Sequence, residues 1–329
     1  MKVVLLDSQV ISGYDYSIEQ KIFEDAGFEF VKETCKNEDE VIEKCLDADA
    51  ILNICVKMTE KSINQLEKCQ VLVRYGIGYD EFDVEAATKR GIKVCNVSKY
   101  CIPEVALHAT TLILSASRQI LHFTTAVRNG LWNKSLGNVM KRPSSQTIGL
   151  IGFGNISRTV ASNLKGIGYN VVAYDPFLPD SVFKENNVVR VELDELYKIS
   201  DIISTHVPQT DETYHILNKS SFEKMKDGVI IVNTARGGLI CQEDLIDALD
   251  SGKVGAVGLD VLDVEPMTDV EHTLCKRDNV ILTPHIAYNS AEASNELFEQ
   301  VATTAVAVLN GEVPDNVVNK KALSEASLV

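Results

Sequence analysis

The amino-acid sequence predicts an α/β protein of two parallel-sheet domains, with the second domain inserted into the first. Its 329 residues exceed what one compact core usually holds, so two domains are expected. Short apolar runs alternate with amphipathic segments in two separate series, and this alternation is typical of parallel sheets covered on both faces. A long apolar helix is expected between the two series.

The first series occupies the chain up to about residue 97. Its β-branched apolar runs indicate buried strands, and they are Val3–Leu6, Glu29–Val31, Ala50–Ile54, Val71–Arg74 and Lys93–Cys95. Helices are expected between them at about 17–26, 38–46, 59–67 and 83–90. Asp83 suits the N-cap of the last of these helices, and Gly91 suits its end.

A longer helix is predicted from about Pro103 to Arg128. Proline and Glu104 suit its first turn, and Asn129-Gly130 suits its end. Its middle is apolar on most faces, so we expect it to be buried between domains or between subunits.

The second series begins at Gln146. Its expected strands are Thr147–Ile151, Asn170–Tyr174, Val188–Val191, Asp201–Thr205, Val229–Asn233, Gly255–Leu259 and Val280–Thr283, with helices at about 155–165, 192–198, 219–225 and 241–250. A last helix is expected over Ala291–Leu309.

Composition excludes several classes of protein. Hydrophobic residues make up 45% and charged residues 24%, as in globular proteins, and the formal net charge of -15 argues against a nucleic-acid partner. No run reaches the roughly 18 apolar residues of a membrane span, so no membrane association is expected. The eight cysteines form no C-x-x-C pair, which predicts free thiols and a reducing, cytoplasmic location. No metal site is expected, because the metal-like spacing of Glu104 and His108 has no third ligand in view.

A glycine-rich loop follows the first strand of the second series. Gly152, Gly154, Asn155 and Ile156 lead from Ile151 into a helix, where glycines permit a tight turn and close approach of a pyrophosphate to the helix N-terminus. The third position of the fingerprint is Ser157 instead of glycine. The loop predicts a Rossmann-like nucleotide-binding domain, and the first series predicts a Rossmann-like or flavodoxin-like partner domain.

Asp175 ends the next strand. A carboxylate there accepts hydrogen bonds from the adenosine ribose hydroxyls and repels a 2′-phosphate, so NAD is the predicted cofactor. The alternative, that Asp175 caps a turn before Pro176, is weaker beside the glycine loop.

Three polar segments follow later strands of the second series. They are Asn233–Gly238 with Arg236, Gly258–Pro266 with Glu265, and Thr283–Ala287 with His285. At the carboxyl ends of parallel strands such groups border the nucleotide crevice. Arginine binds a carboxylate through a bidentate fork, histidine transfers a proton near neutral pH, and a neighbouring glutamate stabilises the imidazolium. Each residue alone could be an ordinary surface group.

With these motifs in this order, the chain resembles the D-isomer-specific 2-hydroxyacid dehydrogenase family, of which phosphoglycerate dehydrogenase is a branch. The motifs that carry the resemblance are Arg74–Asp80, Asn96-Val97, Glu104–Ala106, the glycine loop, His206–Pro208, Asn233–Gly238, Asp260–Pro266 and Pro284–Ala287. The resemblance implies an NAD-dependent enzyme that interconverts a (D)-2-hydroxy acid and its 2-keto acid by hydride transfer.

The resemblance also implies roles for single residues. Arg236 would hold the substrate carboxylate, His285 would be the acid and base, and Glu265 would orient His285. The cofactor contacts would be Gly152, Gly154, Asn155, Ile156, Asp175, Val207, Pro208, Thr213, Thr234, Ala235 and Asp260. The substrate contacts would be Arg74, Tyr75, Gly76, Ile77, Gly78 and Arg236.

The two series of strands and helices also predict the domain boundaries. We expect residues 1–100 with 291–329 to form a discontinuous substrate domain and residues 101–290 to bind NAD. Hinges are expected near Tyr100 and Tyr288, with the active site in the cleft between the domains. A homodimer is expected by analogy with the family.

Two alternatives stay open for the activity. The first is 3-phosphoglycerate dehydrogenase specifically. Asn53 stands where that branch carries an arginine, although Lys57 and Arg74 keep some positive charge, and four tyrosines could instead favour an apolar substrate: Tyr75, Tyr79, Tyr100 and Tyr288. The second is an NADH-sensing scaffold of the C-terminal-binding-protein type. The short segment after the last expected helix argues against it, because a long disordered tail is lacking.

Overall fold

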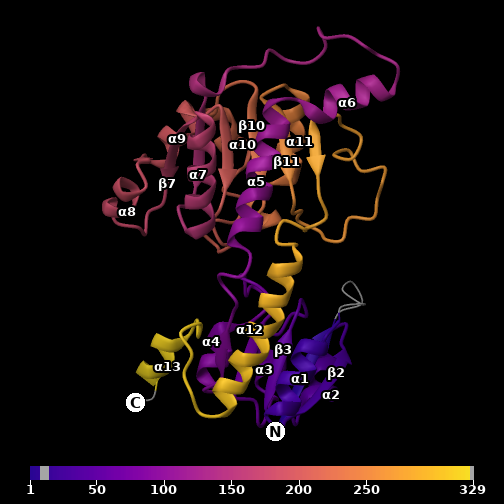
Figure 1. The fold of residues 1–329 in the computed structure, drawn as a ribbon, viewed down its shortest axis with the longest axis vertical. Helices are drawn as coiled ribbons and strands as arrows, with labels where there is room; N and C mark the ends of the chain where they lie inside the picture. The colour runs from indigo at the N-terminus through magenta and orange to yellow at the C-terminus, as the bar shows by residue number, and fades with distance from the viewer. Residues whose placement is uncertain (8–14, 327–329) are drawn as a thin grey trace. The chain divides into compact units, whose positions relative to one another are not determined.

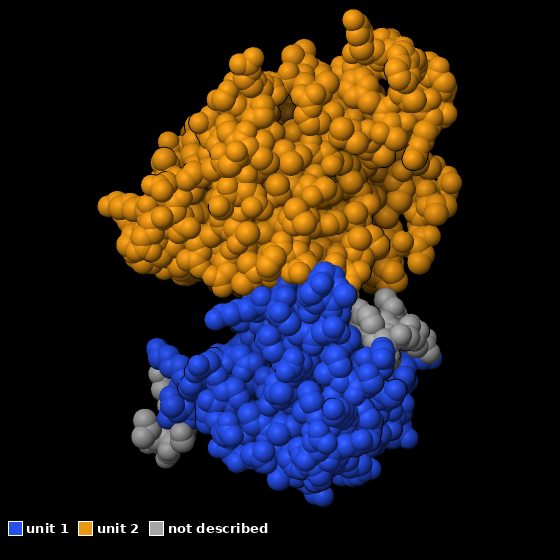
Figure 2. Space-filling view, viewed as in Figure 1, with its two compact units in different colours: residues 1–101, 290–329 blue, residues 102–289 orange. Residues whose placement is uncertain are grey.

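A computed structural model describes residues 1–7 and 15–326 and divides into two compact units. The first consists of residues 1–101 and 290–329, and the second of residues 102–289 (Figure 2). Residues 8–14 and 327–329, which the sequence assigns to the first domain, lie outside the described residues. The predicted α/β class with two parallel sheets, one unit interrupting the other in sequence, is confirmed.

The first unit is built on a five-stranded parallel sheet in the order β2-β1-β3-β4-β5, the strand order of flavodoxin-like folds. The strands are β1 (Lys2–Asp7), β2 (Glu29–Thr34), β3 (Ala50–Asn53), β4 (Val71–Arg74) and β5 (Lys93–Cys95). The helices are α1 (Ser17–Asp25), α2 (Glu38–Cys45), α3 (Glu60–Ile63), α4 (Val84–Lys89), α12 (Ala291–Leu309) and α13 (Lys320–Ala326).

Both faces of this sheet are covered. Leu6, Ile51 and Leu72 belong to a buried cluster that includes side chains of α2 and α4. Helix α12 packs against α1 and against β3 and β4, as the ribbon of this unit shows (Figure 1). The chain therefore returns to its first domain only at the closing helix.

The second unit has a seven-stranded parallel sheet in the order β12-β11-β10-β9-β6-β7-β8, the Rossmann order with one added strand. Its strands are β6 (Thr147–Ile151), β7 (Asn170–Tyr174), β8 (Val189–Arg190), β9 (Ile202–Thr205), β10 (Val229–Asn233), β11 (Val254–Leu259) and β12 (Val280–Leu282). Its helices are α5 (Ile102–Ser117), α6 (Ile120–Arg128), α7 (Asn155–Ile167), α8 (Asp180–Glu185), α9 (Leu193–Ile199), α10 (Lys219–Lys224) and α11 (Gln242–Asp250), with short 3-10 turns η2 (Pro143–Ser145) and η3 (Gly237–Leu239).

Two buried clusters lie on opposite faces of this sheet. One contains side chains of α5 and α7, among them Ile113 and Leu164, and the other contains side chains of α9, α10 and α11, among them Leu196 and Leu245. The strands between them are buried almost throughout, so helices cover both faces of the sheet.

The predicted single helix over 103–128 is wrong in one respect. The chain leaves helical geometry at Gln119, whose φ of 52° is left-handed, and α6 begins at Ile120. Neither glycine nor proline marks this break in the sequence. Gln119 is held there by its amide group, which exchanges hydrogen bonds with the backbone of Asn138 at 2.8 and 2.7 Å.

Candidate active site

The glycine loop joins β6 to α7 in a strand–turn–helix. Gly152 has a φ of +89°, and a Cβ there would lie 2.6 Å from the carbonyl oxygen of His206, so only glycine fits. At Gly154, the N-cap of α7, a Cβ would have no described atom within 4 Å. The protein itself therefore leaves room over the helix N-terminus, where a pyrophosphate would accept amide hydrogen bonds.

Ser157 occupies the third position of the fingerprint without a packing defect. Its side chain is fully buried, and its hydroxyl donates a 2.7 Å hydrogen bond to the carbonyl oxygen of Gly152. Ser157 thus links the first turn of α7 to the glycine loop by a hydrogen bond. This bond is a structural reason for serine at the position where the fingerprint has glycine.

Asp175 also contacts this loop. Its Oδ2 accepts a 2.9 Å hydrogen bond from the amide of Phe153, and its Oδ1 accepts one of 3.0 Å from the amide of Phe177. The residue remains partly exposed, and a carboxylate oxygen has more than one acceptor site. Asp175 can therefore still receive ribose hydroxyls.

The loop after β10 is organised by Asn233, which is fully buried. Its Oδ1 accepts hydrogen bonds from the Thr205 hydroxyl at 2.8 Å and the Ala235 amide at 2.9 Å. Its Nδ2 donates to the Arg236 carbonyl at 2.7 Å. In the described part of the chain the buried hydroxyl of Thr234 has no partner. Because buried polar groups are normally paired, Thr234 suits a cofactor contact.

The loop of Arg236 packs directly on the loop of Glu265. A Cβ at Gly237 would lie 2.0 Å from the backbone of Leu262, so the two loops meet at van der Waals contact only because residue 237 is glycine. The Leu262 amide in turn donates a 2.8 Å hydrogen bond to Glu265 Oε1. The positive charge of Arg236 acts on the Glu265 carboxylate.

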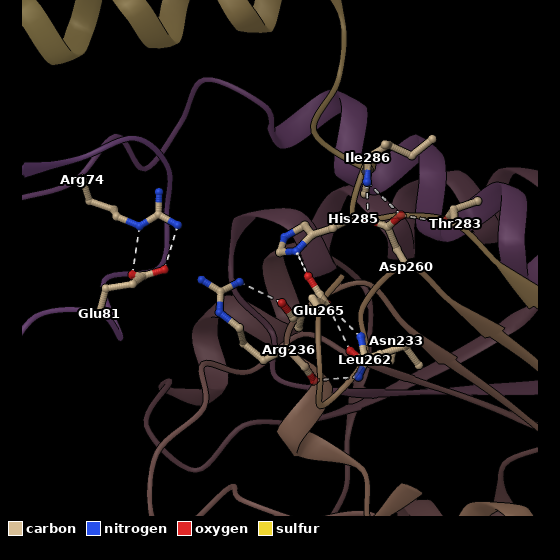
Figure 3. A network of polar contacts seen from close by, with 12 residues as sticks. Arg74, Glu81, Asn233, Arg236, Asp260, Leu262, Glu265, Thr283, His285 and Ile286 are labelled. Atoms are coloured by element: carbon tan, nitrogen blue, oxygen red, sulfur yellow. Dashed lines mark hydrogen bonds and ion pairs between the residues drawn. The ribbon is translucent and has the colours of Figure 1, made fainter. Parts of the chain in front are cut away.

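His285 and Glu265 form the central pair. The imidazole Nδ1 of His285 lies 2.7 Å from Glu265 Oε2, and Figure 3 shows the ring pointing at the carboxylate with Arg236 extending beside them. Burial opposes ionisation of Glu265, but the bonds from His285 and Leu262 and the charges of His285 and Arg236 outweigh it. The pKa of Glu265 is therefore lowered, and Glu265 is the ionised acceptor.

The backbone of His285 has a φ of +55°, a left-handed conformation that non-glycine residues rarely adopt. Asp260 holds it there. The His285 amide donates to the Asp260 carbonyl at 2.8 Å. The Asp260 carboxylate, whose side chain is 0% exposed, accepts from the Thr283 hydroxyl and the Ile286 and Ala287 amides at 2.6, 3.0 and 2.8 Å.

The loop after β9 contains Val207, Pro208 and Thr213. The Thr213 hydroxyl donates to the Pro208 carbonyl at 2.6 Å and accepts from the Thr210 amide at 2.8 Å. Thr213 therefore closes this loop on itself, and Val207 packs against Gly152. These residues sit beside the glycine loop, on neighbouring strands of the sheet.

The first unit presents a second group of predicted residues, at the end of β4. Gly76 has a φ of +139°. Its carbonyl accepts from the Val97 amide at 2.9 Å, and the Ile77 carbonyl accepts from Asn96 Nδ2 at 2.6 Å. The amides of Ile77 and Gly78 donate to no described residue. Two consecutive unengaged amides form a backbone site suited to an anion.

Arg74 is engaged within the same unit. Its Nε and Nη2 donate to the two carboxylate oxygens of Glu81, both at 2.9 Å, and its Nη1 donates to the Tyr75 carbonyl. The Arg74 side chain is 14% exposed. Tyr75 is buried with its hydroxyl on Glu19 at 2.8 Å, and Tyr100 is buried too. These two tyrosines pack, whereas Tyr79 is exposed.

The described residues contain neither a membrane-spanning helix nor a metal-binding cluster. In residues 1–7 and 15–326 no helix combines the length and apolar character needed to span a bilayer. Over the same residues, His, Cys, Asp and Glu side chains do not gather in threes as a bound metal ion would require.

The second unit thus has the features of a dinucleotide-dependent dehydrogenase: a glycine loop before a helix, an acid after the next strand, and an arginine near a Glu–His pair. Comparison with known proteins defines it further. Residues 110–287 match the family model of the D-isomer specific 2-hydroxyacid dehydrogenase, NAD binding domain. The chain belongs to the D-isomer specific 2-hydroxyacid dehydrogenase family, and its cofactor is NAD.

Relatives and solved structures agree. The chain is 42% identical over 282 residues to the hydroxypyruvate reductase of Thermotoga maritima, covering 81% of this chain and 91% of that one. It is 37% identical over 310 residues to the D-3-phosphoglycerate dehydrogenase of Methanocaldococcus jannaschii, covering 94% of this chain but only 58% of that protein. The crystal structure of the Aquifex aeolicus D-lactate dehydrogenase complexed with NAD and lactic acid matches with a TM-score of 0.84 at 28% identity, covering 95% and 96% of the two chains.

The roles of several residues that organise the site were not predicted from the sequence. Asn233 and Thr283 lie inside the motifs of Arg236 and His285, so their positions at strand ends were a usable signal. Asn96 belongs to a quoted motif, but its hydrogen bond to the Ile77 carbonyl joins two loops distant in sequence and could not be predicted. The Leu262 amide acts through its backbone, for which the sequence has no signal.

Proposed function

We propose that this NAD-dependent oxidoreductase interconverts a short, unphosphorylated 2-keto acid and its D-2-hydroxy acid, with Arg236, Glu265 and His285 as the catalytic residues. The observation that carries the proposal is the 2.7 Å contact between His285 Nδ1 and the ionised carboxylate of Glu265. A glutamate that accepts the Nδ1 proton leaves Nε2 as the ring atom that carries and delivers a proton.

Bound NADH would supply the hydride that carbon 2 of the substrate accepts in the reduction. The chain's own groups do the rest. Arg236 binds the substrate carboxylate, which fixes the keto group relative to His285. The Nε2 proton of His285 passes to the keto oxygen, which becomes the hydroxyl. Glu265 stabilises the imidazolium before the transfer, and in the reverse direction His285 takes the proton back.

For the cofactor, we propose the contacts implied by the family. Gly152, Gly154, Asn155 and Ile156 would hold the pyrophosphate, for which the open space at Gly154 is suited, and Asp175 would hold the ribose. Contacts to the nicotinamide half would come from the loop segments Val207, Pro208, Thr213, Thr234, Ala235 and Asp260. Residues 101–290 are the proposed NAD-binding domain, and residues 1–100 with 291–329 the proposed substrate domain.

The substrate proposal depends on the charges in the first unit. Asn53 is neutral and fully buried, and its amide group bonds the backbone of Val56 at 2.7 and 3.0 Å. Arg74 is paired bidentately with Glu81, which leaves little of its charge for a phosphate. The amides of Ile77 and Gly78 suit one carboxylate. The similarity to a hydroxypyruvate reductase supports a small substrate such as hydroxypyruvate or glyoxylate.

Steady-state kinetics test this directly. Glyoxylate, hydroxypyruvate, 2-ketoisocaproate, phenylpyruvate and 3-phosphohydroxypyruvate would be compared at saturating NADH and NADPH. We expect the two smallest acids to have the highest kcat/KM, with NADH preferred. A higher kcat/KM for the phosphorylated acid would refute the substrate proposal. Tight NADH binding without turnover of any acid would refute the proposed enzymatic activity and favour the alternative function as an NADH-responsive scaffold.

We also propose a homodimer formed through α6 and the segment after it. Ile120, Val127 and Leu131 are exposed, and Trp132 is 90% exposed; large apolar side chains gathered on a surface mark interaction sites. Light scattering at low micromolar concentration should give twice the chain mass, and Trp132→Glu should reduce it. The proposed location is the cytoplasm, which suits the eight free cysteines.

A further inference from the structure

We propose that His108 is a positioning residue that fixes the loop of His285 through the hydroxyl of Thr283 and the carboxylate of Asp260. The inference rests on the proposed role of His285 as the proton donor. His108 lies on α5, far along the chain from the catalytic motifs, and nothing in the mechanism above uses it.

The geometry places His108 at the far end of a chain of hydrogen bonds within the second unit. Its Nε2 lies 3.0 Å from Thr283 Oγ1 and 3.6 Å from Asp260 Oδ1. Thr283 Oγ1 lies 2.6 Å from the same Asp260 oxygen. Figure 3 shows Thr283 and Ile286 both bonded to the Asp260 carboxylate, and His285 lies between these two residues in the chain.

The direction of each bond follows from the number of protons available. A threonine hydroxyl has one proton, and the short contact assigns it to the Asp260 carboxylate, which can only accept. Towards His108 the hydroxyl must therefore accept, so Nε2 of His108 carries a proton. A donor at this position is required whether the ring is neutral or charged.

The N–H donor of His108 matters because it supports the buried carboxylate of Asp260. Its carboxylate has no exposed surface, and a buried carboxylate is stable only when its oxygens are well supplied with donors. The donors are Thr283, Ile286 and Ala287, which flank His285 on both sides. Donation from His108 to Thr283 strengthens donation from Thr283 to Asp260, because linked hydrogen bonds polarise one another.

Through these hydrogen bonds, His108 helps to hold His285 in its left-handed backbone conformation. His285 has a φ of +55° and is kept there by its bond to the Asp260 carbonyl. If the link from His108 is lost, the Thr283 hydroxyl loses its orientation and the loop gains freedom. The imidazole of His285 then spends less time aligned with Glu265, and kcat falls while the cofactor site is left intact.

Variants at His108 test the proposal. His108→Leu removes the donor and should lower kcat by about threefold to tenfold, the effect of one lost hydrogen bond. His108→Gln places an N–H near the position of Nε2 and should restore most of kcat. The dissociation constant for NADH, measured by fluorescence, should change less than about twofold in both variants. Thr111→Val, on the same helix with only a local bond to Leu107, is the matched control and should behave as wild type.

A double-mutant cycle with Thr283→Val provides the decisive measurement. If His108 acts through Thr283, His108→Leu added to Thr283→Val lowers kcat by less than about twofold more. Thr283→Ser, which keeps the hydroxyl, should retain the full effect of His108→Leu. Independent effects that multiply, or a His108→Leu variant with wild-type kcat, would overturn the proposal. So would equal losses in the Leu and Gln variants.

The same experiment separates this inference from the proposed function. If wild type is active and His285→Ala is not, but His108→Leu is indistinguishable from wild type, only the role of His108 is wrong. If the wild-type protein turns over no 2-keto acid, the proposed function fails first. Thermal unfolding of each variant shows whether a loss of kcat comes instead from unfolding.

Discussion

Replacing Glu265 by glutamine should slow proton transfer without preventing cofactor binding. Glutamine keeps the size of the side chain but removes the negative charge that faces Nδ1 of His285 at 2.7 Å. The amide oxygen of glutamine can still accept the Nδ1 proton, so the ring keeps its orientation. What is lost is the stabilisation of the imidazolium.

The size of the effect follows from the contact. A hydrogen bond between charged groups contributes about 1.5–3 kcal/mol, and a factor of ten in rate corresponds to about 1.4 kcal/mol. The side chains of His285 and Glu265 are 46% and 35% exposed, and solvent screening favours the lower value. We therefore expect kcat to fall about tenfold.

The assay is NADH oxidation followed by absorbance at one fixed pH, with the best substrate of the panel. Glu271→Gln is the matched control: Glu271 is exposed and pairs with Lys276, so this variant should retain wild-type kinetics. An unchanged kcat in Glu265→Gln would refute the role of the pair.

Three further predictions concern the cofactor, the substrate and stability. Asp175→Asn should weaken NADH binding about threefold to tenfold and allow measurable use of NADPH; an unchanged cofactor preference in kinetic assays would contradict the ribose contact. Arg236→Lys should lower kcat/KM about tenfold to a hundredfold, because a lysine cannot form the bidentate contact. Equal kcat/KM values for the variant and the wild type would refute the proposed contact between Arg236 and the substrate carboxylate. Asp201 is held by Lys141, Lys226 and a backbone amide, and although burial opposes it these bonds lower its pKa. Asp201→Asn should cost about 1–3 kcal/mol in urea unfolding. The pKa of Asp201 is lower in the folded protein than in the unfolded chain, where it is about 3.9. The difference in unfolding free energy between wild type and Asp201→Asn should therefore be complete above that pH and disappear as the pH falls through the folded pKa. A difference that persists in acid would mean that the charge of Asp201 is not responsible.

Much of the fold could be predicted from local patterns. The apolar runs of β6 and β10 and the turn residues after them are visible in the sequence, because burial on both faces of a parallel sheet requires continuous apolar strands. The break at Gln119 could not be predicted, since it depends on a contact with Asn138. The end of α5 is therefore set by a contact outside the helix rather than by its own composition.

The site was predictable only in part for a similar reason. Arg236, Glu265 and His285 stand in recognisable motifs, whereas the pairing of Arg74 with Glu81 depends on how a loop folds back. This pairing weakens the argument that Arg74 supplies positive charge for a phosphate. Asp260 remains a predicted cofactor contact, but the three hydrogen bonds that its carboxylate accepts from the segment around His285 could not be predicted from its motif.

We propose that His285 supplies the proton and contributes little to cofactor binding. The most direct measurement compares kcat and the NADH dissociation constant of His285→Ala with those of the wild-type protein. We predict that reduction of the 2-keto acid falls by about two to four orders of magnitude, while NADH binds within about twofold of wild type. Loss of NADH binding equal to the loss of turnover would contradict this role for His285.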